Sequence, residues 1–140
     1  MVKATLYQAD SIYRVLNEQN DLILVIDCIK LGMPRWISQK QLNEVSECTE
    51  EILRAKATID IRDNLNIEEE GVCNKRFTII ADILPFIGDQ SQRNTAIAKS
   101  AKENRLTTKT IRNMLCKYLA FQDKRVFVPA APKIKGTDPR

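Results

Sequence analysis

The sequence predicts an α+β fold in which a small β-sheet precedes a group of helices. Residues 3–7, 11–17 and 21–29 are rich in β-branched and aromatic side chains, which favours strands. From residue 66 onward, apolar side chains instead recur three and four residues apart, as in amphipathic helices. The chain has 140 residues, of which 44% are hydrophobic, and this is an ordinary length and composition for one small globular protein.

The strand at 21–29 is expected at the centre of the sheet. Leu24 and Ile26 lie on one face and Ile23 and Val25 on the other, which indicates a strand covered on both sides. A short polar connection at 18–20 predicts a hairpin with the preceding strand. Gly32 and Pro34 then interrupt the chain before a short fourth strand at 35–37. Residues 1–43 are therefore predicted to form a small β domain, either a strongly bent sheet or an SH3-like barrel.

Residues 44–72 are interpreted as an acidic, partly helical connector. Positions 44–70 carry nine acidic and three basic residues. Thr49 is placed to start a short helix that contains Ile52 and Leu53. Asn66 is a favourable N-cap, and the three glutamates that follow it suit the positive end of a helix dipole.

Three helices are expected within residues 73–128. The first carries an apolar stripe that ends near Pro85 and Gly88. Asp89 caps the second helix and Thr107 caps the third. The inward residues are predicted to be Phe77, Ile80, Ala81 and Leu84 in the first helix, Ile97, Ala98 and Ala101 in the second, and Ile111, Leu115, Tyr118 and Leu119 in the third.

The second and third helices have the spacing of a helix-turn-helix. A small residue is needed where the two helices cross, and Ala101 provides it. Leu106 and Ile111 follow at intervals of five residues, as the apolar plug of the turn and the anchor of the second helix. The turn lacks the common glycine, so Asn104 or Arg105 must adopt the left-handed conformation, which asparagine tolerates best.

Charge favours an anionic partner for this helical half. Residues 1–75 have a net charge of −4, whereas residues 76–140 have a net charge of +8. The predicted outward face of the third helix consists of Lys109, Arg112, Asn113, Cys116 and Lys117. Basic and amide side chains on such a helix can read base edges in the major groove of double-stranded DNA.

Further contacts to the DNA backbone are expected around that helix. Threonines at its start can donate to phosphates: these are Thr107, Thr108 and Thr110. Basic side chains around it are expected to act as phosphate clamps: these are Arg93, Lys99, Lys102, Arg105, Lys124 and Arg125. Residues 129–140, with three prolines and three basic residues, read as a basic, Pro-rich linker.

Composition disfavours an enzyme. The chain has no histidine, and its four cysteines show no C-x-x-C spacing, so no catalytic residues, metal site or cofactor are expected. The cysteines are predicted to be reduced. The longest apolar run, 22–26, is far too short to span a membrane, and no signal peptide is apparent, so a cytoplasmic protein without membrane contacts is expected, nucleoid-associated when it binds DNA.

Several short runs resemble the N-terminal region of Mu-like transposases, of the DDE or retroviral-integrase-like superfamily. The resemblance extends over most of residues 11–135 and consists of short local runs. They are Tyr13-Arg14-Val15-Leu16, Leu24-Val25-Ile26-Asp27-Cys28-Ile29-Lys30, Met33-Pro34, Trp36, Ile83-Leu84-Pro85-Phe86-Ile87-Gly88-Asp89, Thr110-Ile111-Arg112 and Lys117-Tyr118-Leu119-Ala120-Phe121-Gln122-Asp123.

The resemblance implies a role in DNA transposition and integration. In that family the N-terminal region binds the transposon ends, and a catalytic domain with three metal-binding carboxylates follows it. The chain ends at Arg140 within what resembles the linker before that domain, so it is expected to be a non-catalytic fragment. Asp27 is not expected to belong to the catalytic triad. Other transposition proteins, or copies of the chain assembled on DNA, are the further partners that the resemblance suggests.

Two other interpretations remain open at this stage. A helix-turn-helix transcriptional regulator would form dimers on palindromic sites, whereas a transposase region would bind asymmetric end repeats. A protein-interaction module would use its small β domain for a partner and would show no salt-dependent affinity for DNA.

Overall fold

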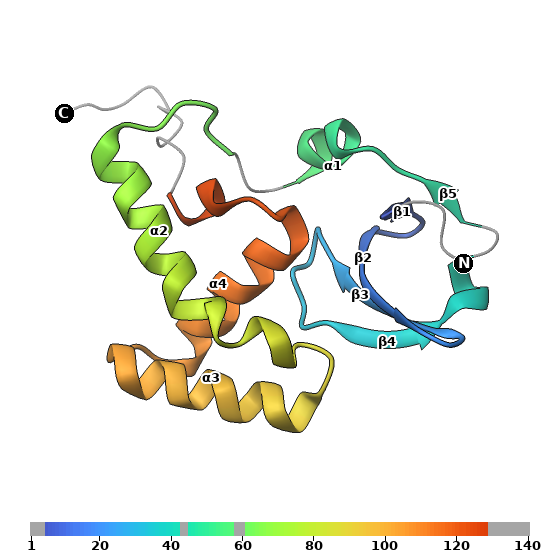
Figure 1. Ribbon diagram of the computed structural model, residues 1–140. Coiled ribbons are helices and arrows are strands. Elements are labelled where there is room, and N and C mark those ends of the chain that lie inside the picture. The colour runs from blue at the N-terminus through green and yellow to red at the C-terminus, as the bar shows by residue number, and fades with distance from the viewer. Residues whose placement is uncertain (1–4, 43–44, 58–60, 129–140) are drawn as a thin grey trace.

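A computed structural model of the protein describes residues 5–42, 45–57 and 61–128 (Figure 1). The predicted α+β class is confirmed, with strands toward the N-terminus and helices toward the C-terminus. The first half contains β1 (Leu6–Gln8), β2 (Ile12–Gln19), β3 (Leu22–Asp27), β4 (Arg35–Ser38), the 3₁₀ turn η1 (Gln39–Leu42) and β5 (Ser46–Glu47). It is followed by α1 (Glu50–Lys56), α2 (Ile67–Ala81), η2 (Leu84–Phe86), α3 (Gln90–Asn104), α4 (Thr108–Phe121) and η3 (Lys124–Phe127).

The strands form one antiparallel sheet in the order β4-β3-β2-β1-β5. The prediction of 1–43 as the whole β domain is too short, because β5 returns to pair with β1. This two-residue strand has no apolar alternation, so its sequence carries no strand signal. β4 and β5 are the edge strands of the described sheet. The pairing of β2 with β3 shifts register between Val15 and Asn17, as at a β-bulge.

β3 lies between two apolar cores, as its sequence predicts. Ile23 and Val25 pack with Tyr7 and Leu42 in a small cluster on one face of the sheet. Ile26, on the opposite face, belongs to the large core that the sheet shares with the helices. The strand is therefore covered on both sides.

The predicted helix starts are confirmed by their caps. The side chain of Thr49 accepts a 3.2 Å hydrogen bond from the backbone N–H of Ile52. Asn66 and Glu69 form a reciprocal capping box at the start of α2. Because this helix starts at residue 67, the helical unit begins inside the predicted connector.

The inward face of α3 differs from the prediction at one position. Ile97 and Ala101 are buried as expected, but Ala98 is exposed. Arg93 and Ser100 take the remaining inner positions, and the Ser100 hydroxyl donates a 2.7 Å hydrogen bond to the carbonyl oxygen of Ile79. The spacing of apolar residues does not reveal polar side chains that face inward. The prediction therefore placed Ala98 on the inner face.

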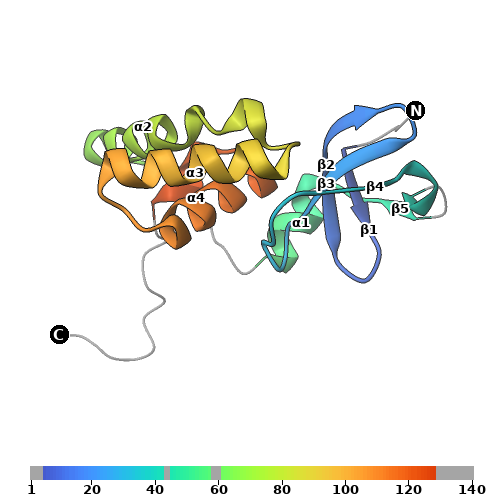
Figure 2. The same cartoon turned by 90° about the horizontal axis from the view of Figure 1, so that it is seen from below.

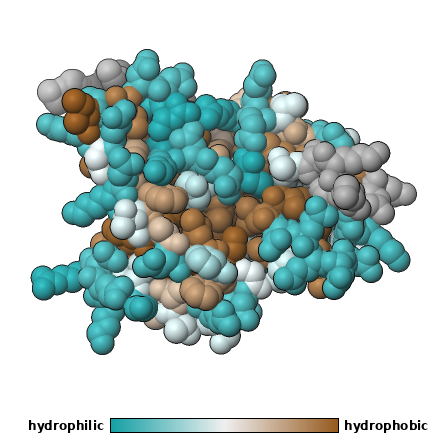
Figure 3. Space-filling view, viewed as in Figure 1, coloured by the Kyte–Doolittle hydropathy of each residue, from teal (hydrophilic) through white to brown (hydrophobic). Residues whose placement is uncertain are grey.

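The sheet and the helices share one continuous core. Figure 2 shows the sheet beside the helices, with α1 next to the place where they meet. Leu6, Ile12 and Ile26 of the sheet belong to the same buried cluster as Ile97 and Ile111 of the helices. On the face drawn in Figure 3, hydrophobic side chains gather in the middle, where helices and sheet meet, and hydrophilic side chains surround them. The two halves are thus held in a fixed relative position by packing.

Candidate nucleic-acid interface

The turn between α3 and α4 has the geometry of a left-handed helix cap. Arg105 adopts φ 56° and ψ 40°, and the backbone N–H of Leu106 donates to the carbonyl oxygen of Ala101 at 2.9 Å. The left-handed residue of the turn is therefore Arg105 and not Asn104, although asparagine tolerates this conformation better. Asn104 is instead the last residue of the helix, and its side-chain amide donates to the carbonyl oxygen of Ser100 at 2.8 Å.

The three spacing residues of the helix-turn-helix pack as predicted. Ala101 and Ile111 are buried in the main core, and Leu106 packs against it. Thr107 caps α4, because its hydroxyl accepts a 3.1 Å hydrogen bond from the backbone N–H of Thr110. The Thr107 and Thr110 hydroxyls also lie 2.9 Å apart.

The first two turns of α4 are open to solvent. Only Ile111 is buried between residues 108 and 113. The exposed side chains brought together there are Thr108, Lys109, Thr110, Arg112 and Asn113. Five of the predicted DNA contacts therefore share one accessible surface, and Thr107 and Arg105 lie in the turn that leads into it.

The second half of α4 is covered by the sheet. Cys116, predicted to face outward, is buried, and its thiol lies 3.5 Å from the carbonyl oxygen of Gly32 and 3.4 Å from the Met33 sulfur. Burial raises the pKa of the Cys116 thiol to about 11. The prediction that Cys116 faces outward is wrong, because the loop between β3 and β4 packs against this side of the helix. Helical spacing alone does not indicate this contact.

Arg93 is a structural residue, and its prediction as a surface clamp is corrected. It is only 7% exposed. Its guanidinium donates to the carbonyl oxygens of Ile87 at 2.9 Å and Pro34 at 3.3 Å, so it joins the start of α3 to the sheet. Desolvation by burial lowers the pKa of Arg93. Arg93 is therefore not part of the exposed surface around α4.

Lys124 and Arg125 lie at the opposite end of α4 from the exposed turns. A helix of this length separates its ends by about 20 Å. Arg125 forms a 2.6 Å ion pair with Asp123 and also donates to the carbonyl oxygens of Arg62 and Asp63. The Lys124 ammonium lies 4.6 Å from the centre of the Phe77 ring. The structure does not bring these two side chains to the surface formed by 108–113.

Two of the remaining predicted DNA contacts lie on α3 and one lies in a groove beside α4. Lys99 and Lys102 are exposed on α3. Lys117 is half-buried and lines a groove between α2 and α4 together with Lys75 and Arg76. The sequence prediction missed these two residues of α2, although Val72, Lys75, Arg76 and Ile79 recur at helical spacing.

Neither a metal site nor a membrane span is found in the described ranges. No group of three or more His, Cys, Asp or Glu side chains is placed to hold a metal ion there. None of the described helices has the length and apolar character needed to cross a membrane. The predicted linker 129–140 lies outside the described residues.

Sequence comparison finds no matching protein family and no matching curated protein.

Proposed function

We propose that the protein binds double-stranded DNA through the first two turns of α4, as the end-recognition region of a transposase. The observation that carries this proposal is the exposed surface of residues 108–113, where Lys109, Arg112 and Asn113 project from a capped helix that follows a helix-turn-helix turn. In such motifs the N-terminal part of the recognition helix contacts base edges. The transposase assignment rests on the resemblance of the sequence runs given above.

The roles of the side chains follow from their chemistry. Arg112 is suited to a bidentate contact with guanine, and Asn113 to one with adenine. Lys109 and the threonine hydroxyls supply donors for phosphates. The net charge of +8 on residues 76–140 provides sequence-independent attraction to the duplex.

The proposal is tested by separating recognition from general affinity. A preferred duplex is first selected from a random pool, and the affinities of the wild type, Arg112→Ala and Asn113→Ala are compared on that duplex and on random DNA. Each substitution should reduce the discrimination by about 1–3 kcal/mol. Lys40→Ala, an exposed lysine of η1, serves as the matched control.

Three outcomes are distinguishable. Loss of discrimination supports base contacts by α4, whereas equal losses on both DNAs would reassign Arg112 and Asn113 to phosphates. Unchanged binding would contradict the proposed surface. The stoichiometry on the selected duplex separates the transposase interpretation, with an asymmetric site, from that of a dimeric regulator, with a palindromic one.

A further inference from the structure

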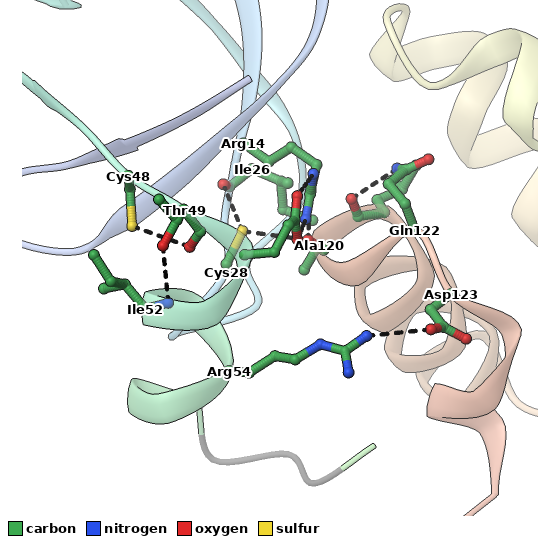
Figure 4. Close-up of polar contacts among 12 residues, drawn as sticks. Arg14, Ile26, Cys28, Cys48, Thr49, Ile52, Arg54, Ala120, Gln122 and Asp123 are labelled. Atoms are coloured by element: carbon green, nitrogen blue, oxygen red, sulfur yellow. Dashed lines mark hydrogen bonds and ion pairs between the residues drawn. The ribbon is translucent and has the colours of Figure 1, made fainter. Parts of the chain in front are cut away.

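The two sides of α4 are unequally accessible. Arg112, Cys116 and Ala120 are four residues apart and therefore lie along one side of the helix. Cys116 contacts the β3–β4 loop, and the carbonyl oxygen of Ala120 contacts Arg14 of β2 (Figure 4). Beyond Arg112, this side of the helix is closed by the sheet.

The other side of α4 faces a groove. Thr110, Asn113 and Lys117 line this groove of about 570 Å³, and Lys75 and Arg76 line it from α2. None of the described residues that line it is Asp or Glu. By contrast, the hollow between α3 and the segment from the end of α2 to η2 includes both Asp82 and Glu103.

The donors in the groove are continuous with the proposed recognition surface. Thr110 and Asn113 belong to both, and Lys117 follows Asn113 by one helical turn. The Arg76 guanidinium is held by a hydrogen bond to the carbonyl oxygen of Phe127, which fixes its charge beside the groove. The Lys75 side chain is exposed.

We infer that one strand of the bound duplex runs along the α2–α4 groove, on the side of α4 away from the sheet. This inference rests on the proposed function and specifies how the DNA is oriented on it. Phosphates meet the ammonium groups of Lys75 and Lys117. The deoxyribose rings meet the apolar part of the groove, which Ile79 and Met114 help to form. An acidic peptide would suit the same charges, but the sharing of Thr110 and Asn113 with the recognition surface favours the DNA strand.

The test measures how affinity depends on salt for Lys75→Ala, Lys117→Ala and the double variant. Each lost phosphate contact should make the log–log slope shallower by about 1 and weaken binding equally on selected and random duplexes. Lys30→Ala is the matched control, because Lys30 is an exposed lysine of the loop on the closed side of α4. Its slope should equal that of the wild type. Unfolding curves of all variants show whether each is folded.

The outcomes separate this inference from the proposed function. If Arg112→Ala removes discrimination while the Lys75 and Lys117 variants keep the wild-type slope, the strand does not occupy the groove and the inference fails alone. A shallower slope for Lys30→Ala, without one for Lys75→Ala, would place the strand on the sheet side and also overturn it. If the wild type does not bind duplex DNA at all, both the function and the inference are overturned.

Discussion

The Nε of Arg14 donates a 2.6 Å hydrogen bond to the carbonyl oxygen of Ala120, which joins the second strand to the last turn of α4 (Figure 4). Arg14 is buried, and its two terminal nitrogens contact both carboxylate oxygens of Glu50 in α1 at 2.9 and 2.7 Å. The positive charge lies at the negative end of the α4 dipole. One side chain thus joins the sheet, α1 and α4.

Arg14→Met should destabilise the protein by about 2–3 kcal/mol, because it leaves a buried helix carbonyl without its charged donor. Glu50→Gln is the matched control, because the Glu50 side chain is 55% exposed and its change leaves the Arg14–Ala120 hydrogen bond in place. Glu50→Gln should therefore cost much less. Denaturant unfolding measures both variants. Equal free energies of unfolding for the two would show that the Ala120 contact contributes nothing.

The four cysteines should differ sharply in their reactivity toward an alkylating reagent. Cys48 is partly exposed, whereas Cys28, Cys73 and Cys116 are buried. Burial also raises the pKa of Cys28 to about 12 and that of Cys116 to about 11, so little reactive thiolate exists near neutral pH. Mass spectrometry of the native protein should find Cys48 labelled first, and all four labelled in denaturant. Labelling of Cys116 as fast as that of Cys48 would refute the packing of the β3–β4 loop on α4.

Glycine should stabilise the protein at the two left-handed residues that end α3 and α4. Arg105 and Gln122 have φ values of 56° and 55°, a conformation that costs residues with a Cβ atom about 1–2 kcal/mol. After allowance for the greater freedom of glycine in the unfolded chain, Arg105→Gly should stabilise the protein by about 0.5–1 kcal/mol. Thermal unfolding should show a higher midpoint for Arg105→Gly and a lower one for Arg105→Val. A lower midpoint for the glycine variant would be inconsistent with this cap.

Asp123 should make stability depend on acid pH. Hydrogen bonds from Arg125 lower the pKa of Asp123, and Arg54 of α1 lies 3.4 Å from the same carboxylate. A carboxyl group with a lowered folded-state pKa stabilises the protein above its unfolded pKa of about 3.9, and this contribution is lost as the pH falls through the folded value. Asp123→Asn should thus destabilise at pH 7 and have a smaller effect at pH 3. Asp21→Asn, in the β2–β3 turn, is the control. If Asp123→Asn lowered the free energy of unfolding by the same amount at pH 7 and pH 3, the lowered pKa of Asp123 would be contradicted.

Much of the fold is predictable because local signals agree with the tertiary structure. The apolar residues on both faces of β3 and the caps Thr49, Asn66 and Thr107 each act within a few residues. β5 could not be predicted in this way, because its pairing with β1 depends on a distant strand and not on its own sequence.

The candidate site was predictable in its outline but not at its edges. Helical spacing alone places Arg112 and Asn113 on an exposed surface. The same spacing places Cys116 outward, and only the docking of the sheet reveals that this position is buried. Arg93 is basic like the exposed lysines around it, and the carbonyl groups that hold it inside come from elements distant in sequence. Tertiary contacts therefore decide which basic residues are exposed and which are buried.

DNA binding by α4 is measured first by fluorescence anisotropy of the purified protein with duplex DNA at several salt concentrations. We expect binding with a log–log slope of roughly −3 to −5, together with a preference for one duplex in competition. No binding at low salt would contradict this expectation, and the basic side chains of α4 would then be a solvated helix surface.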